Sequence, residues 1–403
     1  MTYCFLLLPL ALIMRTKNIK RVKKLLLPVF TLAIWGLLLA ASCSPEDNPK
    51  TPQRVVLIYM AGDNSLSAES YSNITALKMG FTPANGRILV YQDARDAAPR
   101  LFTLEKEGTT VVEKPIEEYA EENSADPAVL NRVLLRVKDL YPAEDYGLIL
   151  WSHATGWLPK GVYNVAVKSR SALMGTDYPK VKTFGEDGGY EMELGNLAAA
   201  IPYRLSFILF DACLMGGIEM AYALKDATDY IIAAPTEVLA SGFPYEQIMQ
   251  PLFLPQPNLT AVCDAFYNVY NEMSGLYRSA TVSLYATAGL PELANTLRPV
   301  FAAHREVLAS FNPSGVQKYD RLTNTLFYDL DDFVKQLASP SEYTLFKTAL
   351  DKVVVYKRAT PNFIEIPIDR YGGISTYIPR ALPAVLNESY KNTAWNKAVV
   401  LVE

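Results

Sequence analysis

Short apolar runs alternate along most of the chain with segments whose apolar residues recur at helical spacing. Runs with the length and the β-branched or aromatic content of buried strands lie at 54–60, 87–92, 147–151, 208–211, 229–234 and 280–285. Between two of them, Asp126 and Pro127 form a favourable start for a helix at 128–140. Strands that alternate with amphipathic helices favour right-handed crossovers. The pattern therefore predicts an α/β fold with a mostly parallel central sheet and helices on both faces.

The regular pattern is interrupted in the middle of the chain and changes towards its end. The segment 155–189 is too long for an ordinary connection, which is typical of a lid, an insertion or a cleavage site. Beyond residue 290, amphipathic helices at 290–308 and 328–337 precede a late strand at 373–379. We therefore expect a catalytic-type α/β domain at 54–290. A C-terminal helical portion at 291–403 should add helices and one or two strands to the same body.

The first residues have the pattern of a targeting segment. A basic stretch, Arg15–Lys24, precedes an apolar stretch, Leu25–Leu39, and small residues then lead into Cys43. This order is typical of a secretory signal, and the small residues before the cysteine resemble a bacterial lipoprotein cleavage site. We predict a signal at 1–42, a polar tether at 43–53 and a lipid anchor on Cys43. The expected location is the cell envelope, at the outer membrane or surface of a Gram-negative bacterium; the alternative is a plain membrane anchor.

Charge narrows the class of partner. The formal net charge of the 403 residues is −4. Residues 1–42 contain six basic residues and no acidic one, so their removal lowers that charge by six, to −10. Because no basic block remains to neutralise phosphates, we do not expect nucleic acid as a partner.

Cysteines supply the first candidate chemistry. Of the four in the chain, Cys4 and Cys43 belong to the leader, which leaves Cys213 and Cys263 for the fold. Two cysteines in a chain of this size do not make a disulfide scaffold, although they could pair. Cys263 lies in a helical pattern, where a buried cysteine is expected. Cys213 follows a predicted strand that ends in Asp211, at the edge where reactive groups of open α/β sheets collect.

Histidines supply the matching base. A thiol attacks a carbonyl only as the thiolate, and histidine can take its proton. Of the two histidines, His304 lies in a helical pattern among charged residues and is expected on the surface. His153 instead ends the strand 147–151, so a parallel sheet would bring it to the same edge as Cys213. The alternative to this dyad is a buried cysteine and a histidine that merely ends a strand.

Two stretches, Leu148–Trp157 and Phe210–Gly216, resemble the two signatures of the clostripain family of cysteine peptidases. That family shares one caspase-like fold with caspases, gingipains, legumain and separase. The resemblance covers roughly 55–245 in order, including Tyr59–Leu66 and the loop Gly242–Tyr245. It implies a caspase-like three-layer sandwich and a secreted cysteine endopeptidase.

The resemblance also assigns roles. It implies that Cys213 is the nucleophile, that His153 gives a proton to the leaving amine, and that the N–H groups of Cys213 and Ala154 bind the oxyanion. The family usually has glycine after this histidine, whereas Ala154 lacks free access to positive φ. That difference motivates an alternative, a catalytically inactive homologue that acts as a surface binding lipoprotein. An enzyme that transfers the acyl group to another amine is a third reading.

Asp211 is the candidate for substrate recognition. Strand alternation points it to the same side as Cys213, and a carboxylate can bind an Arg or Lys side chain. The family resemblance gives the matching acid that role. The expected substrates are therefore peptides and proteins with Arg or Lys at the cleavage site; the alternative is an acid that caps the following helix.

The loop between the two candidate catalytic residues is rich in basic residues. In the clostripain family an equivalent loop is cut autocatalytically after a basic residue, so we expect self-processing at 160–186; solvated loop charges are the alternative. Clostripain is linked to calcium, but Glu186 and Asp187 do not form a dense pattern of oxygen ligands. We predict no cofactor and no obligatory metal.

Overall fold

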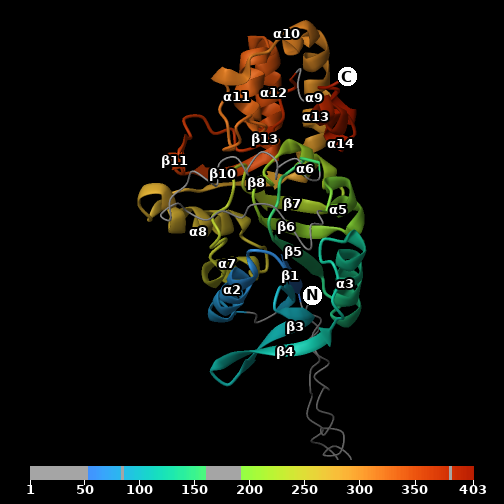
Figure 1. Ribbon diagram of the computed structural model, residues 1–403, viewed down its shortest axis with the longest axis vertical. Helices are drawn as coiled ribbons and strands as arrows, with labels where there is room; N and C mark the ends of the chain where they lie inside the picture. The colour runs from blue at the N-terminus through green and yellow to red at the C-terminus, as the bar shows by residue number, and fades with distance from the viewer. Residues whose placement is uncertain (1–52, 83–85, 160–191, 381–383) are drawn as a thin grey trace, which may run out of the picture. The chain divides into compact units, whose positions relative to one another are not determined.

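The computed structural model describes residues 53–82, 86–159, 192–380 and 384–403 (Figure 1). The expected signal at 1–42, nearly all of the tether at 43–53 and the loop at 160–186 lie outside these residues. Residues Thr51–Glu403 form one compact unit. Within the described ranges, no helix is both long and apolar enough to cross a membrane.

A nine-stranded sheet forms the centre of the molecule, in the order β10-β8-β7-β6-β5-β1-β2-β3-β4. Its five central strands are parallel: β2 (Gly86–Ala94), β1 (Arg54–Gly62), β5 (Asp145–Trp151), β6 (Leu205–Asp211) and β7 (Thr228–Ala233). Antiparallel strands extend it on both sides: β3 (Ala97–Glu107) and β4 (Thr110–Glu118) next to β2, and β8 (Thr281–Ala286) and β10 (Val354–Ala359) next to β7.

Helices cover both faces of this sheet (Figure 1). One face carries α3 (Pro127–Leu140), α5 (Leu194–Ala200) and α6 (Ile218–Ala223), and the other α2 (Ser67–Met79), α7 (Tyr245–Leu252) and α8 (Leu259–Asn271). Central strands are therefore apolar on both sides, and every residue from Val55 to Met60 is at most 3% exposed. The predicted α/β fold with a mostly parallel sheet is confirmed.

The order of the strands indicates at which edge of the sheet a ligand should bind. Strand β1 has β2 on one side and β5 on the other. After β1 the chain adds strands on the side of β2, and from β5 on it adds them on the opposite side, so the strand order reverses between β1 and β5. In open α/β sheets, ligands bind outside the carboxyl ends of the strands at such a reversal. His153 and Cys213 each lie two residues beyond the ends of β5 and its neighbour β6.

The C-terminal portion differs from its prediction in three details. The helix expected at 290–308 is two helices that meet at His304, and the late strand is only the two-residue β13. The strand β10, at the edge of the main sheet, was not predicted; its side chains are half-buried or exposed. The remaining elements are η2 (Gly275–Tyr277), η3 (Thr287–Gly289), α9 (Leu290–Ala303), α10 (Arg305–Ala309), η4 (Pro313–Gly315), β9 (Tyr328–Asp329), α11 (Leu330–Leu337), α12 (Pro340–Val353), β11 (Asn362–Phe363), β12 (Ile366–Pro367), β13 (Ser375–Thr376), α13 (Ala384–Lys391) and α14 (Ala394–Val399).

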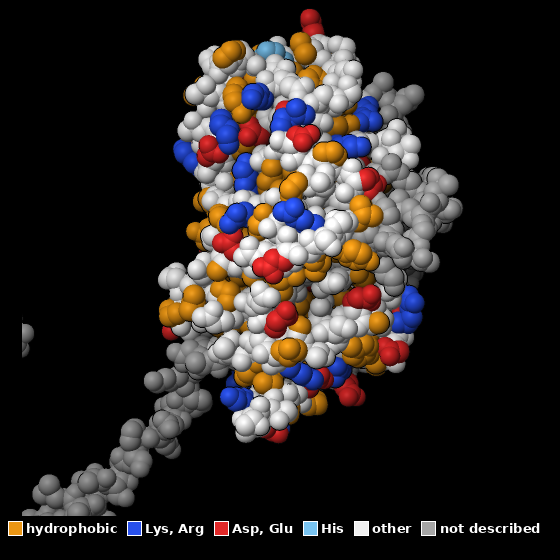
Figure 2. All heavy atoms as spheres, turned by 90° about the vertical axis from the view of Figure 1, so that its left-hand side faces the viewer, with side chains coloured by type: hydrophobic (Ala, Val, Ile, Leu, Met, Phe, Trp, Pro, Cys, Tyr) orange, Lys and Arg blue, Asp and Glu red, His pale blue; other side chains and the backbone are white. Residues whose placement is uncertain are grey.

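The surface carries charges of both signs. On the face drawn in Figure 2, acidic and basic side chains are interspersed, with small apolar patches between them. That face therefore offers neither a uniformly basic field nor a uniformly acidic one.

Candidate active site

Cys213 lies in a sharp turn immediately after β6. Leu214, the next residue, has a φ of 59°, a left-handed conformation that is costly for a residue with a branched side chain. The turn keeps it because Leu214 is fully buried and its N–H donates to the carbonyl of Thr236 at 2.9 Å. Backbone strain of this kind collects at functional sites, and no motif in the sequence indicates it.

The thiol of Cys213 is held by the neighbouring loop. It is 1% exposed, and the N–H of Val238 donates to its sulfur at 3.1 Å. The carbonyl of Val238 lies 3.6 Å from the same sulfur. The main chain of Val238 therefore offers the sulfur both a donor and an acceptor and fixes its position in the turn.

His153 leaves the sheet at the same level as Cys213. In the register of β5 and β6, Trp151 pairs with Asp211, so both candidate residues lie two positions beyond a directly paired position. The imidazole Nε2 lies 2.9 Å from the hydroxyl of Ser65, in the loop after β1. His153 is 6% exposed. Adjacent parallel strands thus bring the two predicted residues to one edge.

Glycine 156 allows the turn after His153 to approach the turn after Cys213. Gly156 has a φ of +62°, and a Cβ at this position would lie 2.7 Å from the carbonyl oxygen of Leu214. The same Cβ would lie 2.7 Å from the ring of Phe327, in the C-terminal portion. Only glycine fits this contact among three segments.

Ala154 follows the histidine without backbone strain. In the described part of the chain, non-glycine residues with positive φ are Leu214, Ile364 and Val400, and Ala154 is not among them. The residue is half-buried and lines the cavity beside His153. Alanine is therefore compatible with this backbone, and the role of its N–H in binding an oxyanion stays a prediction.

Asp211 is completely buried beneath the loop after β7. Its Oδ2 accepts from the N–H of Phe243 at 3.3 Å and from the hydroxyl of Tyr245 at 3.0 Å. Gly242 has a φ of +69°, and a Cβ there would lie 2.4 Å from Oδ2. These contacts explain the Gly242–Tyr245 motif as the cover of a buried carboxylate. Burial, and after it the charge of Asp211, raises the pKa of Tyr245 well above its usual value.

Helix capping by Asp211 is not observed. The helix after the Cys213 turn, α6, has Gly217 at its N-cap, and no side chain caps it. The proposed binding of a substrate cation by Asp211 stays a prediction.

A cavity opens beside His153. It lies on the sheet face that carries α3 and α5, and its walls include Tyr59, Leu150, Ala154, Phe210 and Ala212. Because side chains alternate along β6, this cavity is on the face opposite to Asp211. The edge therefore has an acidic side and a largely apolar side.

Comparison with known proteins identifies the family. Residues 58–393 match the model of the clostripain family. This chain belongs to the clostripain family of cysteine peptidases. The predicted resemblance and the caspase-like fold are thereby confirmed.

Individual relatives agree with this assignment. Clostripain from Hathewaya histolytica is 24% identical over 231 residues, which are 51% of this chain and 43% of that protein, so the match spans less than half of that relative. The structure of an inactive protease zymogen from Parabacteroides distasonis is 36% identical and covers 87% of this chain and 99% of its own, with a TM-score of 0.77. A secreted cysteine protease from Bacteroides thetaiotaomicron, in complex with an irreversible peptide inhibitor, is 27% identical and covers 86% of this chain and 98% of its own, with a TM-score of 0.74.

The remaining candidates from the sequence are the second cysteine, the second histidine and the acidic residues that could bind a metal ion. Cys213 and Cys263 do not form a disulfide with each other, and burial raises the pKa of the Cys263 thiol. His304 is half-buried rather than fully on the surface, with Nε2 3.0 Å from a carboxylate oxygen of Glu342. Among the residues that the structure describes, no group of three or more His, Cys, Asp or Glu side chains could hold a metal ion; Glu186 and Asp187 lie outside them.

Proposed function

We propose that this protein is a cysteine endopeptidase that cleaves peptide bonds after Arg or Lys through Cys213 and His153. One observation carries the proposal. The two residues lie at equivalent positions beyond adjacent parallel strands, and the N–H of Val238 donates a hydrogen bond to the Cys213 sulfur. Membership of the clostripain family supports the same reaction.

In this mechanism the thiolate of Cys213 attacks the carbonyl carbon of the substrate and forms a tetrahedral adduct. The N–H groups of Cys213 and Ala154 stabilise the oxyanion. When the C–N bond breaks, His153 gives its proton to the leaving amine. Water then attacks the acyl-thioester while His153 takes a proton from it, and breaking of the C–S bond releases the acid and regenerates the Cys213 thiolate.

Asp211 supplies specificity in this proposal, because it lies two residues before the nucleophile on the same side of β6. A buried carboxylate binds a guanidinium or ammonium strongly only when the cation replaces its present partners. The hydrogen bond from the Tyr245 hydroxyl to Asp211 would therefore break when the substrate side chain binds Asp211. The relative solved with a peptide inhibitor supports peptides as the substrate class.

Maturation belongs to the same proposal. Self-cleavage after a basic residue at 160–186 would give two chains that stay together. The burial of both Cys213 and His153 and the description of one relative as an inactive zymogen support a protein that matures before it acts.

Export and lipid anchoring through Cys43 are proposed from the sequence of residues 1–43. One relative is described as secreted, which supports export. We expect Cys43→Ser to move the protein from the membrane fraction to the soluble fraction of the cell envelope. An unchanged distribution would exclude the lipid anchor.

The alternative function is that of a surface binding lipoprotein without catalysis. Burial of Cys213 and Asp211 favours it, because a substrate cannot reach either side chain in this conformation. Both functions use the same edge of the sheet and differ only in turnover.

A fluorogenic peptide with Arg or Lys before the cleaved bond separates the two functions. Wild type and Cys263→Ala, which changes the other buried thiol, should cleave it and should also cut themselves at 160–186. Cys213→Ala should do neither. If wild type and Cys213→Ala are equally silent and neither is cut, the binding lipoprotein is the better account. Transfer of the acyl group to an added amine would indicate a transferase.

A further inference from the structure

A segment of the C-terminal portion, Gln317–Tyr328, contacts both turns of the candidate active site. We call it the strap. At one end Phe327 packs against Gly156, three residues after His153. In the middle of the strap Arg321 binds Glu237, the residue before Val238, whose N–H donates to Cys213. The strap therefore links the two halves of the dyad from outside the predicted catalytic domain.

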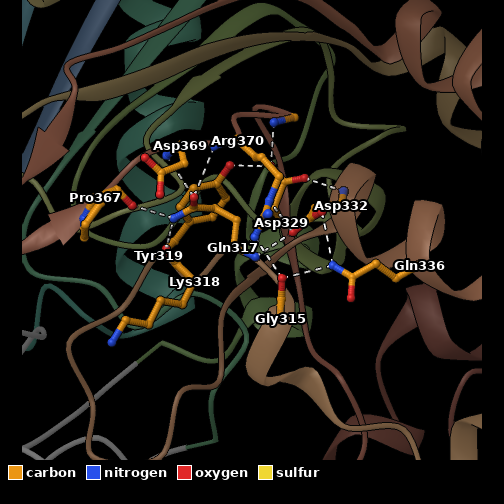
Figure 3. Close-up of polar contacts among 11 residues, drawn as sticks. Gly315, Gln317, Lys318, Tyr319, Asp329, Asp332, Gln336, Pro367, Asp369 and Arg370 are labelled. Atoms are coloured by element: carbon orange, nitrogen blue, oxygen red, sulfur yellow. Dashed lines mark hydrogen bonds and ion pairs between the residues drawn. The ribbon is translucent and has the colours of Figure 1, made fainter.

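The start of the strap is anchored to the C-terminal portion (Figure 3). The side chain of Gln317 donates to the carbonyl of Pro367 at 2.8 Å and accepts from the N–H groups of Asp369 and Arg370 at 3.1 and 3.2 Å. The backbone N–H of Gln317 donates to Asp332 at 2.7 Å. A residue bound on both its side chain and its main chain gives the strap a fixed origin.

Asp320 closes the middle of the strap into a rigid loop. This carboxylate is 1% exposed and accepts from the N–H groups of Leu322, Leu326 and Phe327 at 2.9, 2.7 and 2.7 Å. Arg321 and Phe327 therefore lie in one loop whose main chain is joined through Asp320.

Arg321 and Glu237 form a buried, two-pronged ion pair. Nε donates to Oε2 at 2.6 Å and Nη2 to Oε1 at 2.9 Å, and the side chains are 11% and 3% exposed. Glu237 lies between Thr236, whose carbonyl accepts from Leu214, and Val238, whose N–H donates to the thiol. By binding Glu237, the guanidinium therefore fixes the middle of the three-residue segment whose main chain contacts Cys213 and Leu214.

We propose that Arg321 is a positioning residue for the nucleophile. By binding Glu237, Arg321 keeps the N–H of Val238 within hydrogen-bond distance of the Cys213 sulfur. The active site is therefore incomplete without the strap. The effect on catalysis rests on the proposed function, whereas the effect on the loop does not.

Hydrogen exchange tests the effect on the loop without any turnover. In the full chain, Arg321→Gln should accelerate amide exchange in peptides that cover 236–240 by about tenfold or more, because the substitution removes the two-pronged ion pair that holds Glu237. Arg358→Gln, which removes an exposed pair with Asp264, is the matched control and should leave this exchange unchanged. Equal exchange in wild type and Arg321→Gln would overturn the proposal.

Kinetics test the positioning role. Arg321→Gln should lower kcat by about tenfold or more and change KM by less than about twofold, because a displacement of catalytic groups by about 1 Å can cost about a hundredfold in rate. Arg321→Lys keeps the charge but not the planar fork and should recover part of kcat. A change in KM alone would mean that the pair contacts the substrate, and would overturn the proposal.

A second variant decides the case if Arg321→Gln loses the fold as a whole. Glu237→Gln combined with Arg321→Gln replaces both charges of the ion pair by amides of similar size, so the fold should return. Faster exchange at 236–240 with a low kcat in this double variant supports the proposal, and wild-type values of both overturn it. Should the wild type cleave no peptide at all, the proposed function fails, while the exchange experiment still judges the strap.

Discussion

The turns that follow β5 and β6 carry one candidate catalytic residue each, but they are stabilised in different ways. The turn after His153 depends on side chains from distant segments: Ser65 contacts the imidazole, and Trp157 packs on Tyr377 and Tyr390 at ring distances of 4.8 and 4.9 Å. The turn after Cys213 depends on the main chain. The N–H of Leu214 donates to Thr236 at 2.9 Å, and that of Gly216 to Ala234 at 2.8 Å.

This difference has a physical consequence. Main-chain contacts persist when side chains change, so the position of the thiol should tolerate most substitutions around it, except in the Arg321–Glu237 pair that holds the loop contacting it. Side-chain contacts are lost one at a time, so the position of the imidazole should be sensitive to remote substitutions. Gly156 is where the two turns meet, and changes there should affect both.

Substitution at this meeting point is the most severe test. Gly156→Ala must place a Cβ 2.7 Å from the Leu214 carbonyl oxygen at a positive φ, so the turns must separate. We expect kcat/KM to fall by about a hundredfold or more and the free energy of unfolding to fall by about 1–3 kcal/mol.

Gly195→Ala is the matched control for this variant. A Cβ at Gly195 meets nothing within 4 Å, and the residue lies in helix α5, so alanine should stabilise the protein slightly. Peptidase kinetics and chemical denaturation measure both variants. Near-wild-type kcat in Gly156→Ala would mean that contact between the turns does not matter.

Removal of one side-chain contact from the histidine is the next test. Ser65→Ala deletes the hydroxyl that lies 2.9 Å from Nε2 of His153. We expect kcat to fall by about tenfold with KM unchanged, because the imidazole loses a fixed orientation. Ser65→Thr, which keeps the hydroxyl, should recover activity. Ser72→Ala, an exposed serine of α2, is the control, and equal kcat in all variants would remove the distinction between the two turns.

The strap allows a test by pH, because it supports both turns at once. Burial raises the pKa of Asp320 to about 7 from its ordinary 3.8, so folding favours the protonated form. The stability that this carboxyl contributes is complete below its unfolded pKa and is lost as pH rises through about 7. We expect the free energy of unfolding to fall by about 1 kcal/mol between about pH 6 and pH 7.5. Denaturation curves of wild type and Asp320→Asn measure it; the same slope in both would assign the loss to other groups.

The two turns also differ in how far sequence predicts them. Apolar strands that end in His153 and Cys213 predicted the shared edge, because side-chain identity and strand order are local signals. Leu214 in a left-handed conformation was not predictable, since leucine has no preference for it. The contacts of Val238 and Ser65 depend on how loops return to the edge, which no periodicity encodes.

Asp211 and Arg321 mark the limit of such reasoning in the site. The spacing of Asp211 from the cysteine predicted its side of the strand, but not the cover formed by Phe243 and Tyr245. Arg321 lies more than eighty residues from its partner, in a segment with no motif, so no local pattern connects it to Glu237. Long-range pairs of this kind appear only when the chain is folded.

The smallest expected effect comes from Ala154, at the position where the family usually has glycine. A missing glycine would impair the histidine turn only if the backbone needed a positive φ, and Ala154 does not have one. Ala154→Gly should therefore change kcat by less than about twofold, while the added backbone freedom lowers the free energy of unfolding by about 0.5–1 kcal/mol. Peptidase kinetics beside denaturation curves separate the two effects. A tenfold gain in kcat would mean that the oxyanion donor needs a conformation that alanine denies it, and the histidine turn would then be limited by its main chain as well as by its side-chain contacts.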